Sequence, residues 1–160
     1  MSELPIKKTD SVFDELQSMQ DRIMKRAYEI FDLNGNFGSD LDNWLQAERE
    51  LIRKPAIELS EKDNYFNVEV EMPGVNPKDI VIEVTPDELL VKAEMRDEKK
   101  EQRDKVYTRE LKTGSLFRAV VFPKKIDPDK VKAEFKNGLL KISASVAPEK
   151  EAKKVNIHAA

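Results

Sequence analysis

The sequence predicts a mainly β protein, an antiparallel β-sandwich preceded by a helical hairpin. Apolar residues recur at helical spacing before residue 54, they alternate with polar residues after residue 55, and turn residues separate the alternating runs. A period of 3.6 lines one side of a helix, whereas a period of 2 lines one face of a strand. We therefore expect three parts: a helical region over 1–54, a sandwich domain over 55–147 and a flexible tail over 148–160.

Two helices are expected in the first part, over 10–33 and about 40–53. Apolar residues at steps of three and four form one wide stripe on the first helix. Asn34 and Gly35 are suited to end it, and Ser39 is suited to cap the second helix. The short connection containing glycine predicts that the two helices form a hairpin.

Alternation after residue 55 predicts short strands near 66–72, 80–84, 89–93, 116–122, 131–136 and 140–146. Asn137 and Gly138 separate the last two strands, and both central positions of a type I′ turn need positive φ, so these strands are expected to form a hairpin. Regularly spaced strands without interleaved helices are typical of an antiparallel sandwich. A segment with nine charged residues among ten, 96–105, is expected to leave the sandwich as a solvated loop, with a short extra strand over 106–108.

Both ends of the chain are predicted to be loose. Residues 1–9 show little pattern, and the composition turns polar after Pro148. Val155 and Ile157 then place two apolar side chains near the C-terminus, with one residue between them.

Composition argues against catalysis. The chain has no Cys and a single His, His158, and it lacks the G-x-x-x-x-G-K-(S/T) phosphate loop. We therefore expect no enzyme activity, no cofactor and no metal site. The net charge of −3 with mixed signs argues against nucleic acid, no apolar run approaches the roughly 20 residues of a membrane span, and the start lacks a signal-peptide pattern. A cytoplasmic location is expected, and the absence of Cys is compatible with it.

Five motifs in chain order resemble the small heat-shock protein (α-crystallin) family, over roughly 55–157. They are P-G-V at 73–75, Y-T-R-E at 107–110, G-S-L-F-R at 114–118 with F-P at 122–123, A-E-F-K-N-G-L-L at 133–140 and V-N-I at 155–157. The fourth fits the family pattern A-x-x-x-N-G-(V/L)-L completely. Leu116, Phe122 and Val155 depart from the residues the family has there. Within the hairpin, R-A-Y-E at 26–29 and W-L-Q-A-E at 44–48 resemble a short helical segment known from bacterial proteins.

The resemblance implies an immunoglobulin-like sandwich, the α-crystallin domain, and an ATP-independent holdase that binds partly unfolded proteins under stress. It also implies a homodimer that builds a larger homo-oligomer. Arg118 is expected at the dimer interface with Tyr107, Arg109 and Glu110, and the alternative for Arg118 is an exposed edge arginine. Val155 and Ile157 are expected to anchor the oligomer by docking into a neighbouring subunit's groove lined by Ile80, Ile82, Val84, Val131, Ala133 and Phe135.

The apolar stripe of the helix over 10–33 has three possible packing partners: the facing helix, a partner subunit or an unfolding client protein. Exposed apolar patches mark interaction sites, and methionine adapts to irregular partners. The client-binding candidates are therefore Phe13, Leu16, Met19, Ile23, Met24 and Phe31. Two other functions remain open at this point: a monomeric co-chaperone module on the same sandwich, and an enzyme on a sandwich scaffold.

Overall fold

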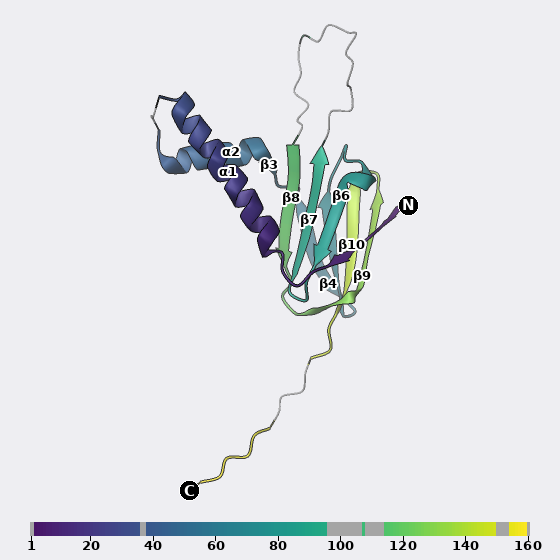
Figure 1. Cartoon of the computed structure of the whole chain (residues 1–160). Coiled ribbons are helices and arrows are strands. Elements are labelled where there is room, and N and C mark those ends of the chain that lie inside the picture. The colour runs from purple at the N-terminus through teal and green to yellow at the C-terminus, as the bar shows by residue number, and fades with distance from the viewer. Residues whose placement is uncertain (1, 36–37, 96–106, 108–113, 150–153, 160) are drawn as a thin grey trace.

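The computed structural model describes residues 2–35, 38–95, 107, 114–149 and 154–159. Two five-stranded sheets pack face to face, and a helical hairpin lies against one of them (Figure 1). The predicted mainly β class, the sandwich and the N-terminal hairpin are confirmed.

Each sheet combines long strands with short edge strands. In order across the first sheet the strands are β1 (Ser2–Leu4), β9 (Ile126–Lys136), β10 (Leu139–Val146), β5 (Tyr65–Glu71) and β4 (Ile57–Lys62). In order across the second sheet they are β2 (Lys7–Lys8), β6 (Ile80–Val84), β7 (Glu88–Met95), β8 (Gly114–Val121) and β3 (Ile52–Arg53). The long ladders are antiparallel as predicted, whereas β2 pairs with β6, and β3 with β8, in parallel.

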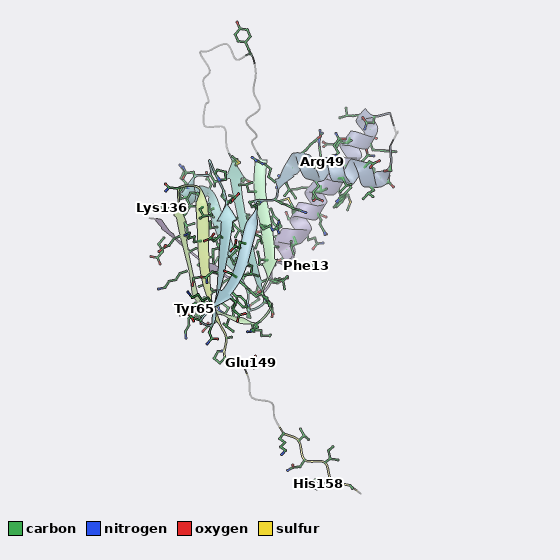
Figure 2. All side chains as sticks on the ribbon, turned by 180° about the vertical axis from the view of Figure 1, so that it is seen from behind. Phe13, Arg49, Tyr65, Lys136, Glu149 and His158 are labelled. Atoms are coloured by element: carbon green, nitrogen blue, oxygen red, sulfur yellow. The ribbon has the colours of Figure 1, made fainter. Side chains whose placement is uncertain are left out.

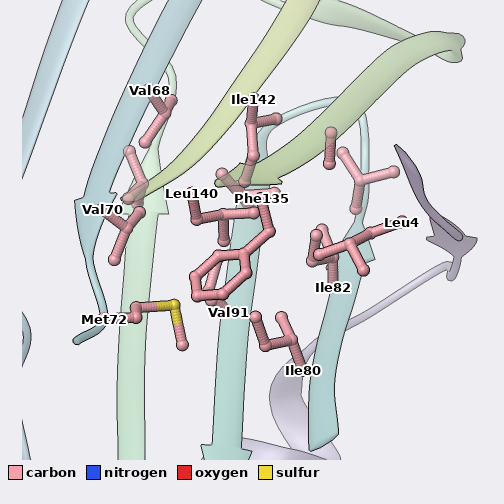
Figure 3. Packing of buried hydrophobic residues seen from close by; sticks show 14 of the residues in the cluster. Leu4, Val68, Val70, Met72, Ile80, Ile82, Val91, Phe135, Leu140 and Ile142 are labelled. Atoms are coloured by element: carbon pink, nitrogen blue, oxygen red, sulfur yellow. The ribbon is translucent and has the colours of Figure 1, made fainter. Parts of the chain in front are cut away.

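The core between the sheets follows from the alternation that the sequence shows. Phe66, Val68 and Val70 of β5 are buried, and they face inward because every second side chain of a strand points to the same side. Figure 3 shows side chains of the first sheet, among them Leu140 and Phe135, meeting side chains of the second sheet. The six predicted strands correspond to β5 to β10.

Turn chemistry sets the register of two hairpins. Asn137 (φ 53°) and Gly138 (φ 77°) both adopt positive φ between β9 and β10, which confirms the predicted turn. Asp63 (φ 52°) and Asn64 (φ 61°) do the same between β4 and β5. The sequence analysis missed this second turn, and it missed β4 with it.

A bulge in β9 accommodates a proline within a strand. The register between β9 and β10 shifts between Ala144 and Val146, so the residues after Ile126 leave regular pairing with β10. Pro128 falls in this interval, where its missing N–H breaks no regular ladder bond. After the bulge, the alternation of β9 leads Ala133 and Phe135 into the core.

The two helices begin close to the predicted residues. Helix α1 spans Phe13–Leu33 and α2 spans Asp40–Leu51. The Ser39 hydroxyl accepts a hydrogen bond of 3.1 Å from the Asp42 amide, so the predicted cap of α2 is confirmed. Helix α2 ends two residues earlier than expected, because Ile52 and Arg53 pair with β8 as strand β3.

The hairpin covers part of the outer face of the second sheet. Leu90 of β7 and Phe117 of β8 point away from the sandwich core and share a second buried cluster with Ile23 and Ile30 of α1. An ion pair of 2.8 Å between Lys92 of β7 and Glu15 of α1 lies beside this contact. The hairpin therefore packs on its own chain in this structure.

The expectation of a loose tail over 1–9 was wrong for residues 2–9. Strand β1 pairs with β9 and β2 pairs with β6, so this segment joins both sheets. Strand pairing is non-local, and three residues of edge strand leave too little alternation to detect. A single-turn helix, Pro77–Asp79, precedes β6. Of the expected strand at 106–108, only Tyr107 is described; the charged segment 96–105 lies outside the described residues, and the three-part division of the chain stays a prediction.

Candidate interaction surfaces

The predicted docking groove corresponds to the side of the sandwich where β6 of the second sheet and β9 of the first both pair with the N-terminal segment. Its predicted lining is mostly buried: Val131 is half-buried, and the buried residues are Ile80, Ile82, Val84, Ala133 and Phe135. The structure thus brings all six together in the core or at its margin.

The chain's own N-terminal segment fills this groove. Leu4 stands opposite Ala133 on β9, and Lys7 stands opposite Glu83 on β6, so the segment crosses from one sheet to the other near Ile6. Leu4 is only 9% exposed, and Ile6 packs against the core cluster. Figure 3 shows Leu4 beside Ile82 at this edge of the sandwich.

Polar contacts hold the end of the same segment that lies beside β6, over residues 7–9. The Thr9 amide donates a hydrogen bond of 2.9 Å to the Val84 carbonyl. Lys7 Nζ lies 3.3 Å from Glu83 Oε1, and the Glu83 side chain is only 5% exposed. Lys8 also forms an ion pair with Asp129, which raises the pKa of Lys8 through their hydrogen bond and charge attraction.

The two anchor candidates project into solvent. Val155 is 78% exposed and Ile157 is 93% exposed. His158, in the same segment, lies far from both sheets in Figure 2. Nothing in the described chain covers this apolar pair.

Arg118 occupies an unusual position on strand β8. It shares the inward face with Leu116 and Val120, which are buried, yet it is only half-buried itself. Strand β3 pairs with β8 only at Ser115 and Leu116, so the outer edge of β8 is unpaired at Arg118 within the described residues. No carboxylate of the described part lies within ion-pair distance of Arg118.

The other dimer candidates are only partly described. Tyr107 is 86% exposed, while Arg109 and Glu110 lie outside the described residues. Strand β4 is the edge strand of the first sheet and pairs only with β5 in the part of the chain that is described. It therefore leaves a row of backbone groups open for pairing.

The six client-binding candidates on α1 divide into two groups. Ile23 is buried, and Leu16 and Met19 pack against the second cluster beneath the helix. Phe13 is 63% exposed and Met24 is 51% exposed, while Phe31 is half-buried. Figure 2 shows Phe13 at the end of α1 that adjoins the sandwich.

Further exposed apolar side chains on the hairpin were missed by the sequence analysis. They are Tyr28, Leu33, Leu41 and Leu45. Spacing along one helix predicted a single buried stripe, but α1 packs on a sheet and on α2 at once, and side chains outside those two contacts stay in water. The hairpin thus presents a dispersed apolar surface.

A cleft of about 430 Å³ lies between α1 and the second sheet. Charged groups of both signs line it, including Glu15, Arg22, Lys92 and Glu94. No group of three potential metal ligands occurs among the described residues. The described helices include none that is long and apolar enough to cross a membrane.

Sequence models of two families match the chain. The model described as the Hsp20/alpha crystallin family matches residues 58–158, more than half of the chain. A second, described as a protein of unknown function (DUF2934), matches residues 18–52, which include most of α1 and all of α2.

Two curated relatives are similar to this chain in sequence. Small heat shock protein C2 of Rickettsia felis is 35% identical over 111 residues, which cover 69% of this chain and 70% of the relative. Spore protein SP21 of Stigmatella aurantiaca is 33% identical over 103 residues, which cover 64% of this chain and 61% of SP21. The chain thus matches about three fifths of the length of SP21.

Solved structures agree on the fold. Heat shock protein 16.0 from Schizosaccharomyces pombe aligns with a TM-score of 0.55 and 28% identity, covering 67% of this chain and 99% of that protein. A small heat-shock protein from Xylella fastidiosa aligns with a TM-score of 0.51 and 24% identity, covering 66% of this chain and 96% of that protein.

Proposed function

Because the chain belongs to the Hsp20/alpha-crystallin family of small heat-shock chaperones, we propose that it is an ATP-independent holdase that binds partly unfolded proteins and keeps them from aggregating. Membership of this family implies a chaperone role. The holdase mechanism needs no bond to be made or broken, so we assign no catalytic residue, no enzyme activity and no cofactor. We also assign it to the cytoplasm, with which a chain that has no Cys is compatible.

One observation above all supports this proposal: the hairpin keeps large apolar side chains in water. Phe13, Met24, Tyr28, Leu33 and Leu41 are each at least half exposed. Partly unfolded proteins expose apolar surface that drives their aggregation. Covering that surface with the hairpin removes apolar area of both partners from water, which is favourable at about 25 cal/mol per Å².

We further propose that two copies form a dimer through β4, β8 and residues 107–110. The open edge of β4 is suited to pair with the segment around Tyr107 of a second copy. Arg118, half-buried and without a carboxylate partner in the described part, is suited to pair with a carboxylate of that copy. Desolvating a charge is costly unless it is paired, which favours such a partner.

Assembly beyond the dimer is assigned to the C-terminal tail. Val155 and Ile157 dock into the groove between β6 and β9 of a neighbouring subunit. Two buried aliphatic side chains contribute only a few kcal/mol, so the contact is reversible. A reversible anchor is compatible with an assembly that must release subunits to bind clients.

The test is light scattering of a heat-labile client protein, heated with and without this protein and without nucleotide. We expect scattering to be suppressed at near-stoichiometric amounts, and added ATP to change nothing. An equal mass of an unrelated stable protein is the control. Undiminished client scattering, from a sample shown by circular dichroism to be folded, would contradict holdase function. If that sample were also monomeric, a co-chaperone module with few clients would be the better assignment.

A further inference from the structure

The groove between β6 and β9 already has an occupant within the chain. Within residues 2–9, Leu4 pairs with the outer edge of β9 and Lys7 pairs with the outer edge of β6. The side chain of Leu4 is buried between the two sheets. We call residues 2–9 the N-terminal plug. While it is in place, β9 is paired at residues 133–135 and β6 at residues 83–84, so another chain cannot pair with these positions.

The plug and the tail have the same apolar pattern. Leu4, Pro5 and Ile6 offer two aliphatic side chains separated by one residue, and so do Val155, Asn156 and Ile157. In an extended chain, side chains two apart point to the same side, so each segment presents a pair to one groove. The pair of the plug is packed, whereas Val155 and Ile157 are 78% and 93% exposed.

The charges next to the two pairs match as well, but in reverse order. Lys7 and Lys8 follow the apolar pair of the plug, whereas Lys153 and Lys154 precede that of the tail. A tail lying antiparallel to the plug therefore places its two lysines where those of the plug lie. Their partners are Glu83, whose side chain is almost fully buried, and Asp129. A buried carboxylate requires a cation, so Glu83 favours a basic segment as replacement.

We propose that the N-terminal plug and the C-terminal tail of a second copy compete for this one groove, so that the plug must leave before the tail docks. This inference rests on the assembly assigned above and adds its control. The fraction of molecules whose plug has left the groove sets the apparent affinity for the tail. The apparent Kd equals the intrinsic Kd divided by that fraction. Conditions that release residues 2–9 thus promote assembly.

A disulfide lock provides the test, since the chain has no Cys of its own. Glu3 and Glu134 stand directly opposite each other on β1 and β9, and both side chains are exposed. Opposite residues of an antiparallel pair have Cα atoms about 4.5–5.5 Å apart, within the range that a disulfide spans. The locked variant is E3C/E134C, and the open variant is L4S/I6S. Glu3→Ser, at an exposed position of the same strand, is the matched control for the open variant.

All variants also carry V155S/I157S, so that tails of neighbouring copies do not occupy the groove. The probe is a fluorescent peptide of residues 152–160, and its binding is measured by anisotropy. We expect the oxidised lock to bind the peptide at least about tenfold more weakly than the same sample after reduction. The open variant should bind several-fold more tightly than the Glu3→Ser control.

Three results would overturn the proposal. The first is equal peptide affinity of the oxidised lock, the reduced lock and the open variant. The second is an E3C/E134C disulfide that fails to form, or that joins two chains on a non-reducing gel. The third is the absence of peptide binding by every variant. Client scattering, measured on the same samples, is independent of these readouts, so a failure of holdase function is distinguishable from a failure of the competition.

Discussion

Arg26 of α1 donates a hydrogen bond of 2.6 Å from its Nε to Oε2 of Glu50 on α2. Their side chains are 33% and 37% exposed, so solvent screens the pair and its contribution to stability is small. A second hydrogen bond, 3.0 Å long, joins Arg26 Nη1 to Glu29 on the same helix. Arg26 thus links the two helices of the hairpin, while apolar packing supplies most of the stability.

This pair predicts a pH dependence. The Arg26 hydrogen bond, followed by that of Gln46, lowers the pKa of Glu50. The stabilisation is therefore complete above the ordinary carboxyl pKa and is lost as the pH falls through the lowered pKa. Glu50→Gln should lower the Tm slightly at neutral pH, and the two Tm curves should converge in acid. A difference in Tm that stays constant with pH would contradict this, and Glu94→Gln is the exposed control.

Arg118→Ala should weaken the dimer. Removing the arginine leaves a partner's carboxylate unpaired at the interface, and for a half-buried pair we expect the dimer dissociation constant to rise about ten- to a hundredfold. The dissociation constant of Arg118→Lys should lie between those of the wild type and Arg118→Ala, since lysine keeps the charge without the planar fork of donors. Sedimentation over a concentration series measures the change, with Lys132→Ala on the exposed side of β9 as control. An unchanged dissociation constant for Arg118→Ala would place this residue outside the interface.

The two exposed candidates on α1 should affect client binding without affecting the fold. Phe13→Ser with Met24→Ser removes two large apolar side chains from water-exposed positions, so client affinity should fall by at least about tenfold. The Tm should stay close to that of the wild type. Gln17→Ser with Gln20→Ser, also exposed on α1, is the matched control. Full suppression of client scattering by the Phe13, Met24 variant would remove α1 from the client surface.

A buried position on the same helix should behave in the opposite way. Ile23 is 4% exposed and packs in the cluster with Leu90 and Phe117. Ile23→Ala should lower the free energy of unfolding by about 2–5 kcal/mol through the cavity it leaves. Urea unfolding followed by Trp44 fluorescence measures this, because Trp44 packs against the same cluster. A loss below about 0.5 kcal/mol would mean that α1 does not pack on the sheet in solution.

Gly138 tests the turn between β9 and β10. Its φ of 77° is unfavourable for other residues, and a Cβ at this position would lie 3.0 Å from Cα of Pro73. Gly138→Ala should therefore lower the free energy of unfolding by at least about 1–2 kcal/mol. Asn137→Gly keeps a residue that tolerates positive φ, so it should change the free energy of unfolding by less than about 1 kcal/mol. Similar values for the two variants in urea unfolding would contradict a strained turn.

The interaction surfaces were predictable to different degrees. The six lining residues of the docking groove were expected from the motif resemblance. Ile82 and Ala133 lie together in the core, and their role in binding a tail stays a prediction. The plug was missed although one signal was present, because Leu4 and Ile6 repeat the spacing of Val155 and Ile157. Roles for Arg118, the tail pair and the exposed helix residues stay predictions, since each depends on a second chain.

The sequence by itself determined those parts of the protein that depend on neighbouring residues. Alternation produces β5 to β10, helical spacing produces α1 and α2, and positive φ at Asn137 and Gly138 joins the last two strands. These features were predictable because the physical causes, side-chain direction and backbone sterics, act within a few residues of the chain.

Tertiary structure alone decided what depends on distant residues. Strands β1 and β2 exist because β9 and β6 offer open edges more than 70 positions away, as the pair Lys7 and Glu83 illustrates. The inward side of α1 is buried because Leu90 and Phe117 cover the outer face of the second sheet with apolar surface. Backbone groups at a sheet edge and an apolar sheet face become partners only once the sandwich has formed, and no local pattern specifies which segment will occupy them.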